Sequence, residues 1–128
     1  MIKTAIHRLG DLQLRIMKVL WAQGEATVAE VHKALGAESD LAYTTVATML
    51  RKMEARRLVT HRLEERSFVY RAVVGEAEVS RGMADHLLDR LFEGSLSDMV
   101  RHLLSSREVS RAELSKVEKL IAEQKRRR

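Results

Sequence analysis

The stretch that decides the fold runs from residue 43 to residue 73 and reads YTTVATMLRKMEARRLVTHRLEERSFVYRAV. Its first half carries apolar residues at the i, i+3, i+4 and i+7 positions of one helix face, namely Val46, Met49, Leu50 and Met53. This spacing predicts a helix over about 42–55. Its second half contains two runs rich in valine, tyrosine, phenylalanine and threonine, 58–63 and 68–73, on either side of the polar residues 64–67. These runs predict a β-hairpin, and a helix followed directly by a hairpin is typical of a winged helix.

Two shorter helices are predicted upstream of this stretch. Apolar residues recur at helical spacing over 11–23, and Gly24 is a typical helix stop. Thr27 and Glu30 have the spacing of a capping box, which predicts a second helix that ends near Gly36. Three helices and a hairpin make a winged helix-turn-helix, expected over residues 1–75, with Gly75 as the boundary.

Residues 76–128 show helical periodicity only and predict three further helices that end in a basic tail, KRRR. The fold class is therefore mainly α with a small β-hairpin. The segment from Val79 to Ile121 holds 16 sizeable apolar residues, more than three short helices can enclose. We expect a homodimer, with packing against the winged helix of the same chain as the alternative. The expected dimerisation residues are Met83, Leu87, Leu88, Leu91, Phe92, Met99, Leu103, Leu114, Val117 and Ile121.

Composition excludes several function classes. The chain has 128 residues and no cysteine, which rules out disulfides, thiolate zinc sites and cysteine nucleophiles. No P-loop, nucleophile elbow or paired-carboxylate motif is present, so we expect neither an enzyme nor a cofactor. The five histidines, His7, His32, His61, His86 and His102, include no pair at i, i+3 or i, i+4 spacing, so no metal site is expected. The N-terminal MIKTAIHRLG lacks the apolar core of a signal peptide and no run of 18 apolar residues occurs, which favours a cytoplasmic protein without membrane insertion.

The distribution of charge indicates a polyanionic partner. The formal net charge is +5, and seven basic residues meet only three acidic ones between Arg51 and Arg71. The helix over 42–55 turns a small polar face outward that could enter the major groove of double-stranded DNA, formed by Tyr43, Thr44, Ala47, Thr48 and Arg51. Lys52, Arg56 and Arg57 near its end, and Arg66 at the hairpin tip, are expected to meet backbone phosphates.

Two other function classes remain open at this point. A ligand-sensing winged-helix regulator would hold a small molecule in an apolar pocket between the fourth and sixth helices. A winged-helix protein-interaction module would show no salt-dependent binding to duplex DNA.

The segments RLGDLQLRIMKVLWAQGEATVAEVHKAL and LAYTTVATMLRKMEARRLVTHRLEERSFVYRAVV resemble the penicillinase-repressor family, whose members include BlaI and MecI. The run Tyr43-Thr44-Thr45-Val46, with Thr48 and Leu50 after it, is similar to the family's recognition helix and adds Thr45 to the expected DNA contacts. Beyond residue 76 the likeness is an apolar helical pattern and the Gly94-Ser95 turn.

The resemblance implies a homodimeric repressor of antibiotic-resistance promoters that carry dyads related to TACA and TGTA. It also implies induction by proteolysis, triggered by a membrane sensor of β-lactams. The cleaved bond of the best-known members matches His102 and Leu103 here, with different side chains. The absence of cysteine excludes the copper-thiolate branch of the family.

Overall fold

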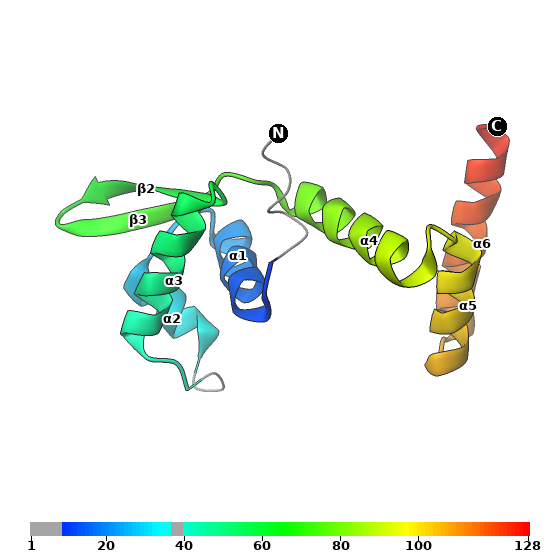
Figure 1. Ribbon diagram of the computed structural model, residues 1–128, viewed down its shortest axis with the longest axis horizontal. Coiled ribbons are helices and arrows are strands. Elements are labelled where there is room, and N and C mark those ends of the chain that lie inside the picture. The colour runs from blue at the N-terminus through cyan, green and yellow to red at the C-terminus, as the bar shows by residue number, and fades with distance from the viewer. Residues whose placement is uncertain (1–8, 37–39) are drawn as a thin grey trace. The chain divides into compact units, whose positions relative to one another are not determined.

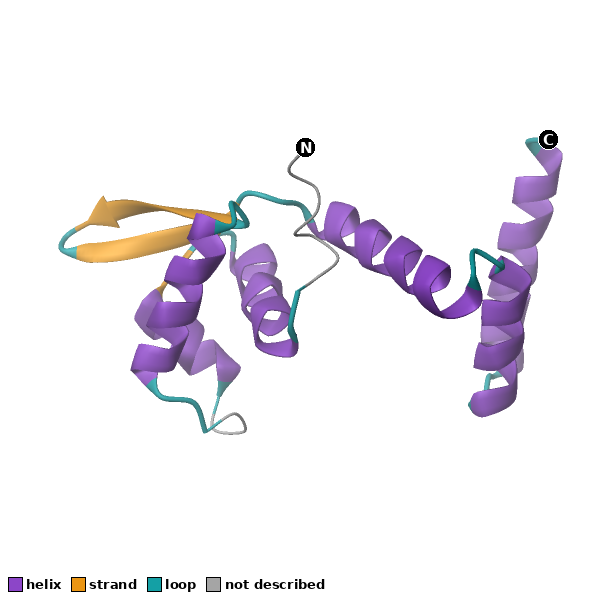
Figure 2. Cartoon of the chain, viewed as in Figure 1, coloured by secondary structure: helices purple, strands orange, loops and turns teal. Residues whose placement is uncertain are grey.

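The computed structural model describes residues 9–36 and 40–128. Residues 1–8, which include His7 and most of the N-terminal segment tested above for a signal peptide, lie outside the described residues. The chain divides into two compact units, Met1–His86 and Leu87–Arg128. Figure 2 shows that helices make up most of both units and that the strands belong to the first. In the described ranges no helix is long and apolar enough to cross a membrane.

The first unit is a winged helix-turn-helix. It contains three helices, α1 (Asp11–Gln23), α2 (Val28–Leu35) and α3 (Tyr43–Ala55), and a hairpin of β2 (Val59–Glu64) and β3 (Ser67–Ala72). The predicted helices and hairpin are confirmed to within one or two residues. A further strand, β1 (Ala26–Thr27), was not predicted; it pairs antiparallel with β3 and completes a sheet of order β1-β3-β2.

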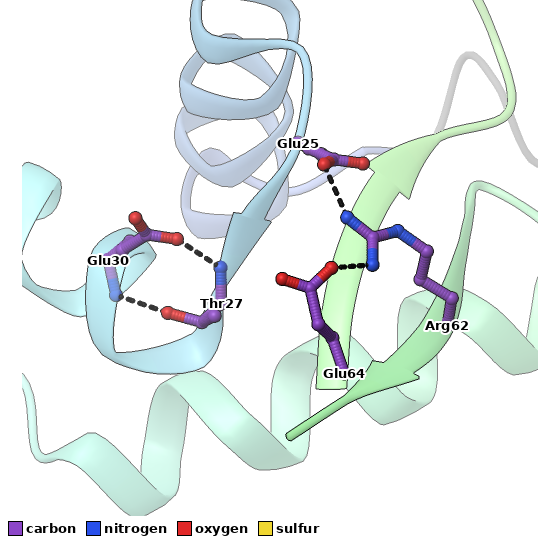
Figure 3. Close-up of polar contacts among 5 residues, drawn as sticks. All are labelled: Glu25, Thr27, Glu30, Arg62 and Glu64. Carbon is purple, nitrogen blue, oxygen red and sulfur yellow. Dashed lines mark hydrogen bonds and ion pairs between the residues drawn. The ribbon is translucent and has the colours of Figure 1, made fainter. Parts of the chain in front are cut away.

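Local signals explain where these elements begin and end. Gly24 stops α1 with φ of 87°, a conformation that favours glycine, and its N–H donates to the Leu20 carbonyl at 2.8 Å. At the start of α2 the predicted capping box is present. The Thr27 hydroxyl accepts from the Glu30 N–H at 3.1 Å, and the Glu30 carboxylate accepts from the Thr27 N–H at 2.7 Å (Figure 3).

The core of the first unit collects the apolar faces of α1, α2 and α3 and one side of the sheet. It continues past Gly75 into α4 (Glu76–Phe92), because Val79 is only 1% exposed there and Met83 packs against the same cluster. The first turns of α4 therefore belong to the winged-helix core, whereas the sequence placed the boundary at Gly75. Burying Val79 removes its apolar side chain from water. It also covers a part of the core that the three preceding helices do not close.

The second unit contains the end of α4 together with α5 (Leu96–Ser106) and α6 (Arg111–Arg126). Serine hydroxyls cap both helices: Ser95 accepts from the Asp98 N–H at 3.2 Å and Ser110 from the Glu113 N–H at 3.1 Å. None of the residues from 87 to 128 is buried. This unit therefore has no closed core of its own.

Candidate nucleic-acid interface

Helix α3 has one face in the core and one in solvent. Val46, Leu50 and Met53 are completely buried, which fixes the rotation of the helix about its axis. The opposite side presents the residues that the sequence placed at DNA. Ala47 on this side is half-buried, and the exposed members are Tyr43, Thr44, Thr45, Thr48, Arg51 and Lys52. The structure thus brings this predicted set together on a single helix surface.

The N-terminus of α3 is held by contacts to α2. The imidazole of His32 donates from Nε2 to the Leu41 carbonyl at 2.7 Å, and its ring meets the Tyr43 ring edge-on at 6.0 Å between centroids. The cap residue Ala42 offers no side-chain acceptor to the first amides of the helix. No side chain therefore caps this end of α3, and the Thr45 N–H donates to the Ala42 carbonyl at 3.1 Å.

Thr48 and Arg51 form a coupled pair one turn further along α3. The Arg51 guanidinium donates to the Thr48 hydroxyl over 3.4 Å, and both side chains are exposed. A guanidinium beside a hydroxyl and the methyl of Ala47 provides donors, an acceptor and an apolar contact. These are the groups that read base edges in a major groove.

Arg66 lies in the turn between β2 and β3 of the hairpin, or wing. In Figure 1 the turn of this hairpin extends beyond α1, α2 and α3. Glu65 and Arg66 are the two central residues of this turn and hold positive φ angles of 47° and 71°. Both side chains are exposed. Arg66 thus lies at the exposed tip of the wing, where the sequence predicts a contact with a backbone phosphate.

Two of the basic residues near the interface are engaged within the protein. Arg62 donates to Glu25 at 2.6 Å and also pairs with Glu64 (Figure 3). The hydrogen bonds that Arg62 donates, first to Glu25 and next to Glu64, raise the pKa of its guanidinium above its ordinary value. Arg56, expected at a phosphate, is half-buried and donates to Gln13 Oε1 of α1 at 2.9 Å. The charge excess counted from sequence is therefore partly compensated inside the fold.

Sequence reasoning missed a cluster that joins α3 to the wing. Nδ1 of His61 on β2 lies 2.7 Å from Oε1 of Glu54 on α3, and the His61 ring stacks on Phe68 with centroids 4.1 Å apart. Next to them, burial raises the pKa of Tyr70, the charge of Glu54 raises it further, and Arg51 opposes this effect. The only sequence signal was the seven-residue separation of an acid and a histidine, which identifies no contact.

The second unit presents an apolar groove between α5 and α6. Its volume is about 1090 Å³, and its apolar lining consists of Leu96, Val100, Leu104, Val117, Leu120 and Ile121. Of the residues expected at a dimer interface, Val117 and Ile121 line this groove, Leu103 lines a smaller one beside it, and Met83 lies in the first unit instead. Leu91 and Leu120 are among the most exposed large apolar residues of this unit, at 67% and 63%.

His102 and Leu103, the expected cleavage pair, are both exposed on α5. The His102 ring lies 5.8 Å from that of Phe92. Among the residues that the structure describes, no three histidines or acidic residues gather closely enough to hold a metal ion.

The fold and the α3 surface define a winged-helix DNA-binding protein of the transcription-regulator class. The penicillinase repressor family model matches residues 9–123. The chain is 28% identical to the penicillinase repressor of Bacillus licheniformis over 96% of both chains, and 39% identical to the transcriptional regulator BlaI of Mycobacterium tuberculosis over 77% of this chain and 73% of that protein.

Among solved structures, the DNA-binding domain of the repressor BlaI matches with a TM-score of 0.51 and 32% identity, over 57% of this chain and 89% of that domain. The chain therefore belongs to the penicillinase repressor family. This is a family of DNA-binding transcriptional repressors and not of enzymes.

Proposed function

We propose that the protein acts in the cytoplasm as a homodimeric repressor that binds a palindromic operator, with α3 and the wing of each protomer on one half-site. The observation that carries this proposal is the exposed surface of α3, where Thr48 and Arg51 stand beside Ala47 with the helix rotation fixed by the core. A twofold dimer presents two such helices and matches a twofold DNA sequence.

The second unit supports the dimer. No side chain from 87 to 128 is buried, although this unit holds Leu87, Leu91, Leu96, Leu120 and other large apolar residues. Full burial of a leucine side chain is worth roughly 1.5–3 kcal/mol, so a second copy that covers the α5–α6 groove would gain several kcal/mol from the partly exposed Leu96, Leu104 and Leu120.

The relatives suggest the targets and the mode of relief. Their names point to penicillinase control, so we assign this protein to β-lactamase-type or related stress promoters. We assign relief of repression to cleavage between His102 and Leu103 by a membrane-linked sensor protease. Both residues are exposed, and cleavage there would divide α5 and remove its share of the groove.

Fluorescence anisotropy with the full chain tests operator recognition. The probes are duplexes with a TACA/TGTA dyad and a scrambled duplex of equal composition. Thr48→Ala and Arg51→Ala should weaken binding to the dyad more than to the scrambled duplex, because base contacts carry selectivity. Arg66→Ala should weaken both alike and flatten the salt slope by about one unit. Equal losses for all three variants would contradict this division of labour, and no preference for any palindrome would contradict the function.

Sedimentation of a Leu120→Glu/Ile121→Glu variant tests the dimer, because both side chains line the α5–α6 groove. We expect monomers and a much weaker operator affinity, because two charges on an apolar surface prevent its burial. Ala112→Glu is the matched control, since Ala112 is exposed on α6 and lines neither groove. A variant that remains dimeric would place the interface elsewhere.

The cleavage assignment is tested by incubating the purified repressor with membranes that contain the activated sensor protease. A new C-terminus at His102, found by mass spectrometry, is the expected result. Intact protein under these conditions would contradict it.

A second candidate function, small-molecule sensing, is favoured by the same groove, because Ser97, Arg101 and Gln124 add polar groups to its apolar lining. Small-molecule sensing predicts that an apolar anion, which would suit the apolar lining and Arg101, lowers the operator affinity of the uncleaved protein.

A further inference from the structure

The two faces of the wing differ in chemistry. Partners across an antiparallel pair point to the same face, so the pairs Val59–Ala72, His61–Tyr70 and Leu63–Phe68 share one face of the hairpin. Val59 and Tyr70 at the base of this face are buried in the core. The last pair is not covered: Leu63 is 66% exposed and Phe68 is 43% exposed. The wing therefore ends in an apolar pair that stays substantially exposed, although the His61 ring covers one side of Phe68.

Contacts of His61 identify which way this face turns. His61 lies within hydrogen-bond distance of Glu54 on α3 and stacks on Phe68. The face that bears Leu63 and Phe68 is thus the one directed toward α3. The opposite face carries Arg62 and Glu64, and Arg62 also pairs there with Glu25, which precedes β1. The apolar pair lies at the end of this face, one pair of residues before the turn that holds Arg66.

We propose that Leu63 and Phe68 pack on the deoxyribose carbons of the DNA backbone beside the groove that α3 enters. The assignment rests on the proposed DNA binding. Three observations favour a DNA sugar edge as the occupant: the face that bears the pair is directed toward α3, Arg66 lies in the turn that joins the two strands just beyond the pair, and the Phe68–His61–Glu54 contacts fix the pair relative to α3. Sugar carbons are the apolar part of a backbone whose phosphates Arg66 can neutralise.

Salt dependence distinguishes an apolar contact from a phosphate contact. Each neutralised phosphate adds about −0.9 to the slope of log affinity against log salt, because counterions are released. Burying carbon against carbon adds affinity without releasing ions. The apolar pair therefore predicts a loss of affinity at an unchanged slope.

The experiment compares full-length Leu63→Ser, Leu63→Met, Arg66→Ala and wild type by anisotropy with the dyad and the scrambled duplex, from about 50 to 200 mM salt. Leu63→Ser should lose roughly 5- to 20-fold on both duplexes at the wild-type slope, on the scale of burying part of a leucine. Leu63→Met should restore most of the affinity. Arg66→Ala should flatten the slope by about one unit. Val73→Ser is the matched control, because Val73 is 53% exposed but lies after the base of the wing.

Each other outcome overturns the proposal. Unchanged affinity of Leu63→Ser would show that the pair does not touch DNA, and a flattened slope would show that it acts through charge. A changed sedimentation coefficient of the free Leu63→Ser protein would assign the pair to a contact between copies. Failure of the wild type to bind either duplex would instead refute the DNA-binding function, so the two failures are distinguishable.

Discussion

The turn of the wing should be strained, and relieving it should raise stability while lowering DNA affinity. Glu65 and Arg66 both hold positive φ, at 47° and 71°, between the paired residues Glu64 and Ser67. This is the geometry of a type I′ turn, for which Asn-Gly is the preferred pair. An L-residue other than Asn or Gly pays roughly 1–2 kcal/mol in the left-handed region. The perturbation is the double substitution Glu65→Asn/Arg66→Gly.

The magnitude follows from two opposing effects. Glycine at position 66 relieves roughly 1–2 kcal/mol and asparagine at position 65 relieves part of a similar amount, whereas the greater freedom of glycine in the unfolded chain offsets about 0.5–1 kcal/mol of this gain. A net gain of about 1 kcal/mol corresponds to a rise in Tm of roughly 4–8 °C for a domain of 60–100 residues. The same variant loses the Arg66 cation, so its affinity for any duplex should fall and its salt slope should flatten by about one unit.

Two measurements on one preparation separate these effects. Thermal unfolding, monitored by circular dichroism, measures stability, and fluorescence anisotropy at several salt concentrations measures DNA affinity and its salt slope. Glu65→Asn alone is the control, because it relieves one position and keeps Arg66. It should be stabilised less than the double variant and bind DNA no more weakly than wild type. A double variant less stable than wild type would refute the strain argument. A double variant that binds with wild-type affinity and slope would refute the phosphate contact of Arg66.

Three further predictions concern the first unit. Thr27→Ala removes the hydroxyl that caps α2 and should lower the free energy of unfolding by about 1 kcal/mol in urea titrations. Val79→Ala should cost at least about 1 kcal/mol in the same measurement, because Val79 is completely buried, whereas the exposed Ala77→Ser should cost little. Because burial raises the folded-state pKa of Tyr70 above its unfolded value near 10, the stability linked to this group is complete below about pH 10 and is lost as pH rises above it. Tyr70→Phe should therefore show a shallower alkaline loss of stability than wild type.

Helix ends were predictable because they depend on a few neighbouring residues. Gly24 takes a backbone conformation that favours glycine, and Thr27 and Ser110 each accept a hydrogen bond from an amide three residues ahead. The outward face of α3 was predictable for the same reason, since the buried positions Val46 and Leu50 determine which side chains remain outside.

Contacts between distant segments were not predictable in this way. Strand β1 has two residues, too few to show an alternating pattern, and its existence depends on β3 lying beside it. The Arg62–Glu25 pair joins residues 37 positions apart, and the pair of His61 with Glu54 requires the packing of the wing on α3. A single sequence contains no local signal for either pair.

The boundary between the two units also depends on contacts between distant segments, and the sequence therefore did not predict it correctly. Gly75 marks a change from strand to helix periodicity, but it lies between two attachments to the first core. On one side the Trp21 indole donates to the Val74 carbonyl at 3.0 Å, and on the other side Val79 is buried in the same core. The first unit therefore extends through His86, and the division falls within the continuous helix α4. Because both parts of this helix show the same apolar periodicity, residue types alone cannot distinguish the part that completes the winged helix from the part whose apolar side chains remain exposed.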